Sequence, residues 1–354
     1  MMDSDQGSQA AENPGTNGPK DQAGAAEVAQ GNGAPAPLDR APLAYENPAF
    51  LGSADGRVLR LIAEYSEPLA RFRKERIQDT VVFFGSARFR GLEEAEGALE
   101  LLENSYAART ASSAEQPARA EEIAAGTATE LQRKRAVAAV EMARYYEDAR
   151  RLAFMLTTWA KTIPSRRSRF VVTSGGGPGI MEAANRGAHE AGGKTIGLNI
   201  QLPFEQSPNP WITPALNFEF HYFFMRKLWF AYLAKALVVF PGGFGTLDEM
   251  FEILTLTQTH KLAKKITVVV YGSEYWKRIM NLQALVDSGA ISPGDFDLFQ
   301  WADTPEQAFE LLKQGLTENY LKPEAAAGKQ PAEQELAAPT AEEVLGPDMA
   351  RTRR

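Results

Sequence analysis

The sequence PGGFGT at residues 241–246 constrains this 354-residue chain more than any other stretch, because two different hydrophobic periodicities meet there. The apolar run 236–240 precedes it and is typical of a short buried strand, whereas apolar residues at helical spacing follow from Met250 to Leu256. Glycines let the backbone turn tightly between strand and helix, and the first N–H groups of the helix then point at whatever binds there. The stretch therefore predicts a phosphate-binding loop, with the acid Glu249 a short distance inside the helix.

Two further junctions of the same kind lie upstream. The strand-like segment 169–173 is followed by SGGGPG at 174–179, and a helical segment then runs to about residue 191. The strand-like segment 80–84 leads into Gly85 and Ser86. Because the carboxyl ends of parallel strands lie at one edge of a sheet, these loops predict ligand binding at the carboxyl edge of an open parallel sheet.

Strands and helices alternate regularly in the second half of the chain. We expect strands at 169–173, 194–198, 217–221, 236–240, 266–271 and 299–302. We expect helices at about 179–191, 223–235, 246–259, 273–287 and 305–317. This alternation predicts an α/β fold, a Rossmann-like doubly wound and mostly parallel sheet with helices on both faces.

One domain is expected over residues 46–322. Within it, segment 92–150 follows the first strand, is rich in Ala, Glu and Arg, and is too long for a simple crossover, so it predicts a helical insertion. The insertion should lead into a core helix at 137–159. Segments 1–45 and 323–354 hold few large apolar residues and are expected to be disordered tails.

Composition excludes several classes of function. Lys and Arg number 38 against 45 Asp and Glu, so no basic excess points to a nucleic-acid partner. The absence of cysteine excludes disulfides and thiolate metal sites, and the three histidines lack ligand spacing, so we predict no metal and no cofactor. No apolar run is long enough for a membrane span. We expect a cytoplasmic protein without a membrane partner.

Two familiar nucleotide-binding loops do not fit the glycine-rich segments. The stretch from Gly175 to Ile180 holds Gly-x-Gly without the third glycine of a dinucleotide-binding loop, and the next strand ends in Asn199 rather than in an acid. Neither loop ends in the Gly-Lys-Ser or Gly-Lys-Thr of a P-loop. NAD binding and P-loop ATP hydrolysis are therefore excluded.

The charged residues near the 241–246 loop have competing interpretations. Thr246 and Glu249 fit a Thr-x-x-Glu capping box, in which the acid only folds back onto its own helix start, and Asp248 fits the helix dipole. Arg226 and Lys227 stand at the start of an apolar helix, where the dipole disfavours cations. They are expected to interact with a negatively charged partner. A position of Arg226 on the surface is the alternative.

The motifs resemble those of a known family. PGG-x-GT-x-x-E at 241–249 is similar to the signature of the Lonely Guy family, the cytokinin riboside 5′-monophosphate phosphoribohydrolases. SGGGPGIMEAANRGA at 174–188 matches the family's other glycine-rich block, YFFMRK at 222–227 resembles its Arg-Lys segment, and PFEQ at 203–206 resembles a block of its bacterial branch. Leu228 and Trp229 depart from plant-like members, which have an acid there, and this departure bears on base specificity.

The resemblance implies a dimer that cleaves the N-glycosidic bond of purine or cytokinin nucleoside 5′-monophosphates such as AMP, releasing free base and ribose 5-phosphate. It places the catalytic pair at Arg226 and Glu249, with Glu249 acting on the sugar and on water and Arg226 as a clamp. The substrate-binding positions that we expect are Ser86, Gly176, Gly177, Glu205, Met225, Lys227, Gly242, Gly243, Phe244, Gly245, Thr246, Asp248 and Thr255.

Two alternatives stay open at this point. The same superfamily includes molybdenum-cofactor carriers, which would use a similar sheet edge to hold a phosphorylated pterin without catalysis. The insertion at 92–150 could instead serve a protein partner while the site is vestigial. The lysine decarboxylase name often given to the family has no support here, because the chain shows no pyridoxal-phosphate constellation.

Overall fold

The structure, a computed structural model, describes residues 40–113, 122–203, 207–262 and 264–322. These residues form one seven-stranded sheet in the order β4-β3-β2-β1-β5-β6-β7, in which every neighbouring pair is parallel. The strands are β1 (Thr80–Phe84), β2 (Val171–Ser174), β3 (Thr195–Ile200), β4 (Asn217–Phe220), β5 (Ala234–Val239), β6 (Thr267–Tyr271) and β7 (Gln300–Ala302). The predicted α/β fold with a parallel sheet is confirmed.

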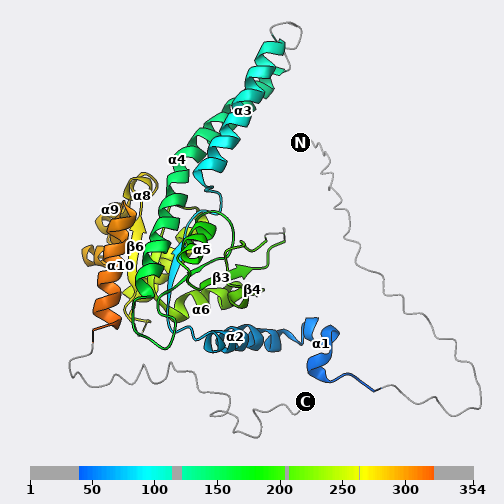
Figure 1. Ribbon diagram of the computed structural model, residues 1–354, viewed down its shortest axis with the longest axis vertical. Helices are drawn as coiled ribbons and strands as arrows, with labels where there is room; N and C mark the ends of the chain where they lie inside the picture. The colour runs from blue at the N-terminus through cyan, green and yellow to red at the C-terminus, as the bar shows by residue number, and fades with distance from the viewer. Residues whose placement is uncertain (1–39, 114–121, 204–206, 263, 323–354) are drawn as a thin grey trace, which may run out of the picture.

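Helices cover both faces of the sheet (Figure 1). One face packs against α4 (Glu122–Ala160), α5 (Ile180–Glu190) and α10 (Pro305–Tyr320). The other face packs against α2 (Arg57–Lys74), α6 (Phe223–Leu233), α7 (Phe244–Gln258) and α8 (Ser273–Ile279). Because side chains alternate across a strand, Val81 and Phe83 of β1 belong to the first core, and Val82 and Phe84 belong to the second. This two-sided burial explains the unbroken apolar runs of the strands.

The chain reverses its direction of travel across the sheet at β1. From β1 it moves outward through β2, β3 and β4, and then returns to add β5, β6 and β7 on the other side of β1. The loops that leave β1 and β5 therefore diverge to opposite faces. Such a switch point opens a crevice at the carboxyl ends of the two strands, where ligands bind in open α/β sheets.

The predicted insertion is a pair of helices that projects from the domain (Figure 1). It consists of α3 (Leu92–Ser113) and the first part of α4, which are joined by the ion pair of Arg133 and Glu103 at 3.4 Å. The last part of α4 lies in the core, where Leu152 and Leu156 are fully buried. The core helix expected at 137–159 is thus the end of a much longer helix.

Two expected helix boundaries were wrong. The helix expected at 273–287 is divided into α8 and α9 (Leu282–Asp287), because Met280 is extended and the side chain of Asn281 accepts a hydrogen bond from the N–H of Ala284. Helix α7 begins at Phe244, earlier than expected. Of the expected tails, residues 1–39 and 323–354 lie outside the described residues, whereas Ala44–Glu46 form a 3₁₀ turn before α1 (Pro48–Gly52).

Two properties of the described residues bear on other classes of function. No helix among them has the length and apolar character that a membrane crossing requires. No cluster of three or more His, Asp or Glu side chains in the described ranges could hold a metal ion.

Candidate functional site

A hollow of about 850 Å³ lies at the carboxyl ends of the strands, beside the switch point between β1 and β5. All three loops that the sequence singled out contribute to it. Residues 84–89 are the end of β1 and the loop after it, Gly175 follows β2, and residues 242–249 follow β5 and begin α7. The volume is in the range of sites that bind small molecules.

Backbone contacts lock the three loops together. The N–H of Ser86 donates to the carbonyl of Pro241 at 3.0 Å, and the carbonyl of Ser86 accepts from the N–H of Ile180 at 3.0 Å. Gly179 has a φ of 71°, and a Cβ atom there would lie 2.3 Å from the carbonyl oxygen of Ser86. Only glycine fits such a position, so the glycine-rich loop after β2 is required for this close approach.

The start of α7 is not built as the capping box that the sequence allowed. The N-cap is Gly243, which makes no side-chain cap, and the helix begins at Phe244, five residues before Glu249. Glu249 is therefore too far along the helix to fold back onto its start, and that interpretation was wrong. The first N–H groups of α7 have no acceptor within the helix and are available to a ligand.

Glu249 is buried but faces the hollow. Its side chain lines the hollow, it is 7% exposed, and within the described chain it accepts no hydrogen bond. Burial raises the pKa of Glu249 to about 7, although the charges of Lys227 and Arg226 act in the opposite direction. A carboxyl group that exchanges its proton near neutrality is suited to general acid–base chemistry.

Arg226 lies in the hollow and not on the surface. Its Nε donates to the carbonyl of Leu198 at 2.7 Å, and its guanidinium lies 5.0 Å above the ring of Phe230. A Cβ atom on Gly175 would come within 2.5 Å of its Nη2, so the guanidinium rests directly on that glycine. Burial lowers the pKa of Arg226 and the charge of Glu249 raises it, but an arginine stays protonated at neutral pH.

Lys227 connects the two helices beside the hollow. Its Nζ forms ion pairs with Asp248 and Glu252, both at 2.8 Å, and thereby ties α6 to α7. Burial lowers the pKa of Lys227, but the bonds to the two carboxylates raise it, and the net result is a pKa above the ordinary value. Lys227 is not among the residues that line the hollow, whereas Asp248 is.

The structure gathers most of the predicted site residues. Those that line the hollow are Ser86, Arg226, Gly242, Gly243, Phe244, Gly245, Thr246, Asp248 and Glu249. Gly176 and Gly177 lie deeper, where their carbonyls accept from Nδ2 of Asn209 at 3.0 and 3.1 Å. Met225 packs against the core on the α6 side. Glu205 lies outside the described residues.

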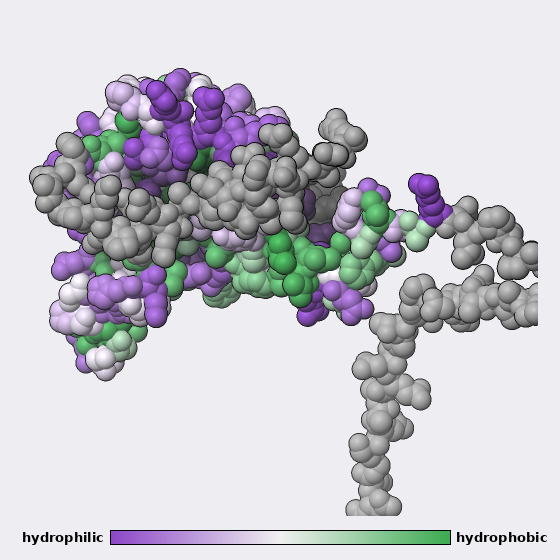
Figure 2. Space-filling view, turned by 90° about the horizontal axis from the view of Figure 1, so that it is seen from below, coloured by the Kyte–Doolittle hydropathy of each residue, from purple (hydrophilic) through white to green (hydrophobic). Residues whose placement is uncertain are grey.

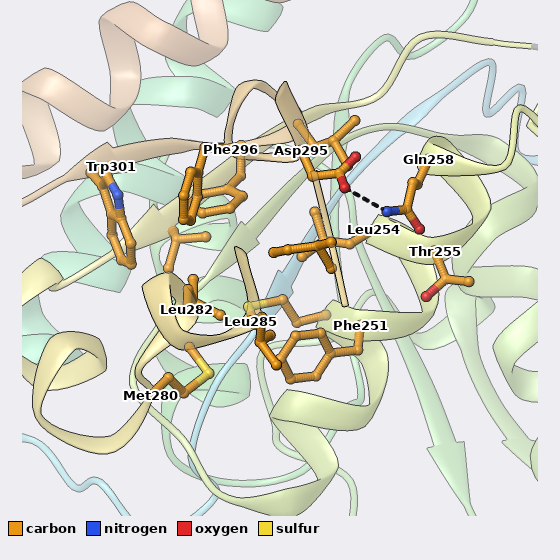
Figure 3. Close-up of a pocket in the computed structure, with 15 residues that line it drawn as sticks. Phe251, Leu254, Thr255, Gln258, Met280, Leu282, Leu285, Asp295, Phe296 and Trp301 are labelled. Carbon is orange, nitrogen blue, oxygen red and sulfur yellow. Dashed lines mark hydrogen bonds between the residues drawn. The ribbon is translucent and has the colours of Figure 1, made fainter. Parts of the chain in front are cut away.

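Thr255 is not brought to the hollow. It follows Glu249 by six residues, about 240° around an α-helix, so the two side chains point in different directions. Thr255 instead lines a smaller apolar pocket of about 100 Å³ between α7, α9 and β7 (Figure 3). Nε2 of Gln258 donates to Asp295 at 2.8 Å beside this pocket.

Several lining residues were missed by sequence reasoning. Arg88 and Phe89 follow Ser86 in the loop after β1, and Tyr275 follows β6, where its hydroxyl donates to the carbonyl of Gly242 at 3.0 Å. The signal that could have found them is their position just after strands at the same sheet edge. Asn199 also lines the hollow. From the sequence it served only to exclude NAD, because a dinucleotide-binding fold has an acidic residue at that position.

The structure is that of an α/β protein with a hollow at the switch point of its parallel sheet, which is the candidate ligand site. The model of a family described as "possible lysine decarboxylase" matches residues 181–312. Over 146 residues the chain is 25% identical to the probable cytokinin riboside 5′-monophosphate phosphoribohydrolase LOGL2 of Oryza sativa subsp. japonica, covering 41% of this chain and 59% of that protein. Over 159 residues it is 24% identical to the cytokinin riboside 5′-monophosphate phosphoribohydrolase LOG5 of Arabidopsis thaliana, covering 44% and 68%.

These matches agree with the resemblance of the motifs to the Lonely Guy family. The chain spans about three fifths to two thirds of the length of these relatives. Among solved structures, the molybdenum cofactor carrier protein of Chlamydomonas reinhardtii is similar with a TM-score of 0.34 and 23% identity, covering 49% of this chain and 89% of that one.

Proposed function

We propose that this protein hydrolyses the N-glycosidic bond of purine nucleoside 5′-monophosphates, releasing the free base and ribose 5-phosphate. The observation that carries the proposal is Glu249, a buried carboxyl with a pKa of about 7 that faces the hollow beside a glycine-rich helix start. The names of the relatives describe this reaction on cytokinin nucleotides.

The helix start explains why a 5′-phosphate belongs to the substrate. The unpaired N–H groups of α7 and the positive end of its dipole favour an anion beside Gly243 and Gly245. The phosphate is remote from the bond that breaks. Its binding energy can therefore hold the sugar in position for attack, which lowers the entropy cost of the reaction.

Glu249 and Arg226 have different roles in the bond cleavage. Positive charge develops on the ribose as the base leaves, and an ionised Glu249 stabilises this charge and accepts a proton from the attacking water. Arg226 keeps its proton, so it clamps phosphate or ribose oxygens and orients Glu249 by its charge.

The rate should depend on pH through Glu249. Because the base must be ionised and its pKa is about 7, kcat/KM should rise with pH and level off above about pH 8. A pH–rate profile with AMP over pH 3.5–9 measures this rise in kcat/KM. A transition centred near the ordinary glutamate pKa of 4.5 would contradict a base whose pKa is raised to about 7.

The direct test is incubation of the purified protein with a panel of nucleoside 5′-monophosphates, followed by detection of free base. Release of base from at least one of them supports the proposal. The carrier alternative makes a different prediction, because a carrier would co-purify with a phosphorylated pterin and release no base. Mass spectrometry of the ligand freed from the purified protein separates these outcomes.

Self-association is part of the proposal. Several large apolar side chains are exposed along α2 and α6, and Figure 2 shows apolar surface on the side where α2 lies. They are Val58, Leu59 and Ile62 of α2 and Phe223, Phe224 and Leu228 of α6. Exposed apolar surface of this kind marks an interface, and Phe223 also lines the hollow, so a second copy would meet this chain beside the site.

Charged substitutions should separate the copies. The double variant Ile62→Glu with Phe224→Glu places two carboxylates on this face, which should convert a homodimer into a monomer without unfolding it. Light scattering coupled to size exclusion measures the mass. The control is Leu101→Glu on the projecting α3, which is also exposed but far from α2 in Figure 1 and should leave the mass unchanged. A monomeric wild-type protein would contradict the self-association.

A further inference from the structure

Arg88 is held at the edge of the hollow by the loop after β1. The backbone just before it is fixed on both sides, because Ser86 bonds to Pro241 of one glycine-rich segment and to Ile180 beside the other. The N–H of Arg88 then donates to Oγ of Ser86 at 3.1 Å, which closes the turn. Arg88 is thus the first long side chain to leave this junction, and it lines the hollow together with Gly242 and Gly243.

The charges around the hollow set Arg88 apart from the other cations. Arg226 is buried, bonded to the carbonyl of Leu198 and opposed by Glu249. Lys227 is neutralised by Asp248 and Glu252. Within the described ranges, the exposed side chain of Arg88 forms no ion pair with a carboxylate.

An unneutralised cation beside the helix start strengthens the binding of a phosphomonoester. The phosphomonoester carries about −1.5 to −2 charges at pH 7, whereas a helix start offers the equivalent of only about half a positive charge. An ionised Glu249 in the same hollow repels the anion further. The glycine-rich loop therefore leaves most of the phosphate charge uncompensated.

We propose that the guanidinium of Arg88 binds the 5′-phosphate and makes the site selective for nucleoside monophosphates over nucleosides. The inference rests on the proposed function and adds to it the group that recognises the phosphate charge. Arginine suits this role because its planar fork of donors matches two phosphate oxygens. Arg88 acts in binding, away from the glycosidic bond.

The test compares Arg88→Ala with a matched neighbour. Loss of one charge-assisted pair should raise KM for AMP about 10- to 100-fold, with kcat changed less than about threefold. Arg88→Lys, which keeps the charge but not the fork, should recover part of the loss. Arg90→Ala is the control, because Arg90 lies two residues away, pairs with Glu94 and does not line the hollow. An unchanged KM in Arg88→Ala, or an equal rise in both variants, would overturn the proposal.

Binding measurements test phosphate recognition by Arg88 separately from the proposed hydrolase function. If the wild-type protein cleaves no nucleotide, the hydrolase function fails, yet calorimetry with AMP and with adenosine still tests Arg88. Arg88→Ala should weaken the binding of AMP about 10- to 100-fold and leave the binding of adenosine unchanged. Equal effects on the two ligands would show that Arg88 does not recognise phosphate. Because the side chain is exposed, the thermal midpoint of the variant should match that of the wild type.

Discussion

The variant Glu249→Gln should lose base release from AMP by about two to four orders of magnitude in kcat, because the amide can neither accept a proton from water nor offset the ribose charge. AMP binding should be at least as tight as in the wild type, since the helix start and its N–H groups are unchanged and the repulsion between the carboxylate and the phosphate is removed. Single-turnover release of free base, together with calorimetric binding of AMP, measures both quantities.

A neighbouring acid provides the matched control. Glu252 stands one turn after Glu249 on α7, pairs with Lys227 and does not line the hollow. Glu252→Gln should keep kcat within a few-fold of the wild type. Near-normal turnover in Glu249→Gln, or an equal loss in both variants, would remove Glu249 from the reaction.

The same substitution should stabilise the fold at high pH. The pKa of Glu249 is raised from 4.5 to about 7, so the stabilising contribution of its neutral form is fully present below about pH 4.5 and is lost as pH rises through 7. Above pH 7 the wild type carries a buried carboxylate that glutamine avoids. The free energy of unfolding of Glu249→Gln should exceed that of the wild type there by up to about 3 kcal/mol, and the difference should vanish near pH 4.

The strands of the sheet were predictable because buried strands have continuous apolar sequences. Each central strand is buried on both faces, so apolar runs such as that of β1 stand out against the polar loops. The α8–α9 break was harder to predict. It depends on one side chain, Asn281, capping a helix of only six residues, and the apolar periodicity around it continues without interruption.

The edge of the sheet that holds the site was also predictable, because parallel strands bring their carboxyl ends together. The roles of individual residues at that edge depend on which way each side chain points, and spacing alone did not settle this. Thr246 and Glu249 have capping-box spacing, yet the glycine loop lets α7 begin at Phe244 and frees the acid. Arg226 reaches the hollow only because α6 packs it over Gly175 and beside the carbonyl of Leu198, and both are tertiary contacts.

The second large effect is expected in Arg226→Ala, which should lower kcat/KM for AMP by about 10²- to 10³-fold, the loss typical of removing one preorganised charged donor. Both KM and kcat should be affected, because in the proposed function the guanidinium clamps the ligand and orients Glu249. Arg226→Lys should recover only part of the activity, since an ammonium cannot keep the bond to Leu198 and contact a ligand with the same fork.

Arg71→Ala is the structural control for this variant. Arg71 makes the same two kinds of contact, donating to the carbonyl of Asn217 at 2.8 Å and lying 3.8 Å above the ring of Phe218, but it is far from the hollow on α2. Arg71→Ala should lower the thermal midpoint and leave kcat/KM unchanged. Equal kinetic losses in the two variants would mean that Arg226 acts only through the stability of the fold.

The pH profile of Arg226→Ala distinguishes two roles of Arg226: holding the phosphate alone, or also interacting with the charge of Glu249. The charge of Arg226 lowers the pKa of Glu249, so its removal should move the acidic limb of kcat/KM upward from about pH 7. Lys227 remains and limits the size of this shift. An arginine that only held the phosphate, too distant to affect Glu249, would leave the limb in place while raising KM. The upward shift therefore requires that Arg226 and Glu249 act on each other in the same hollow.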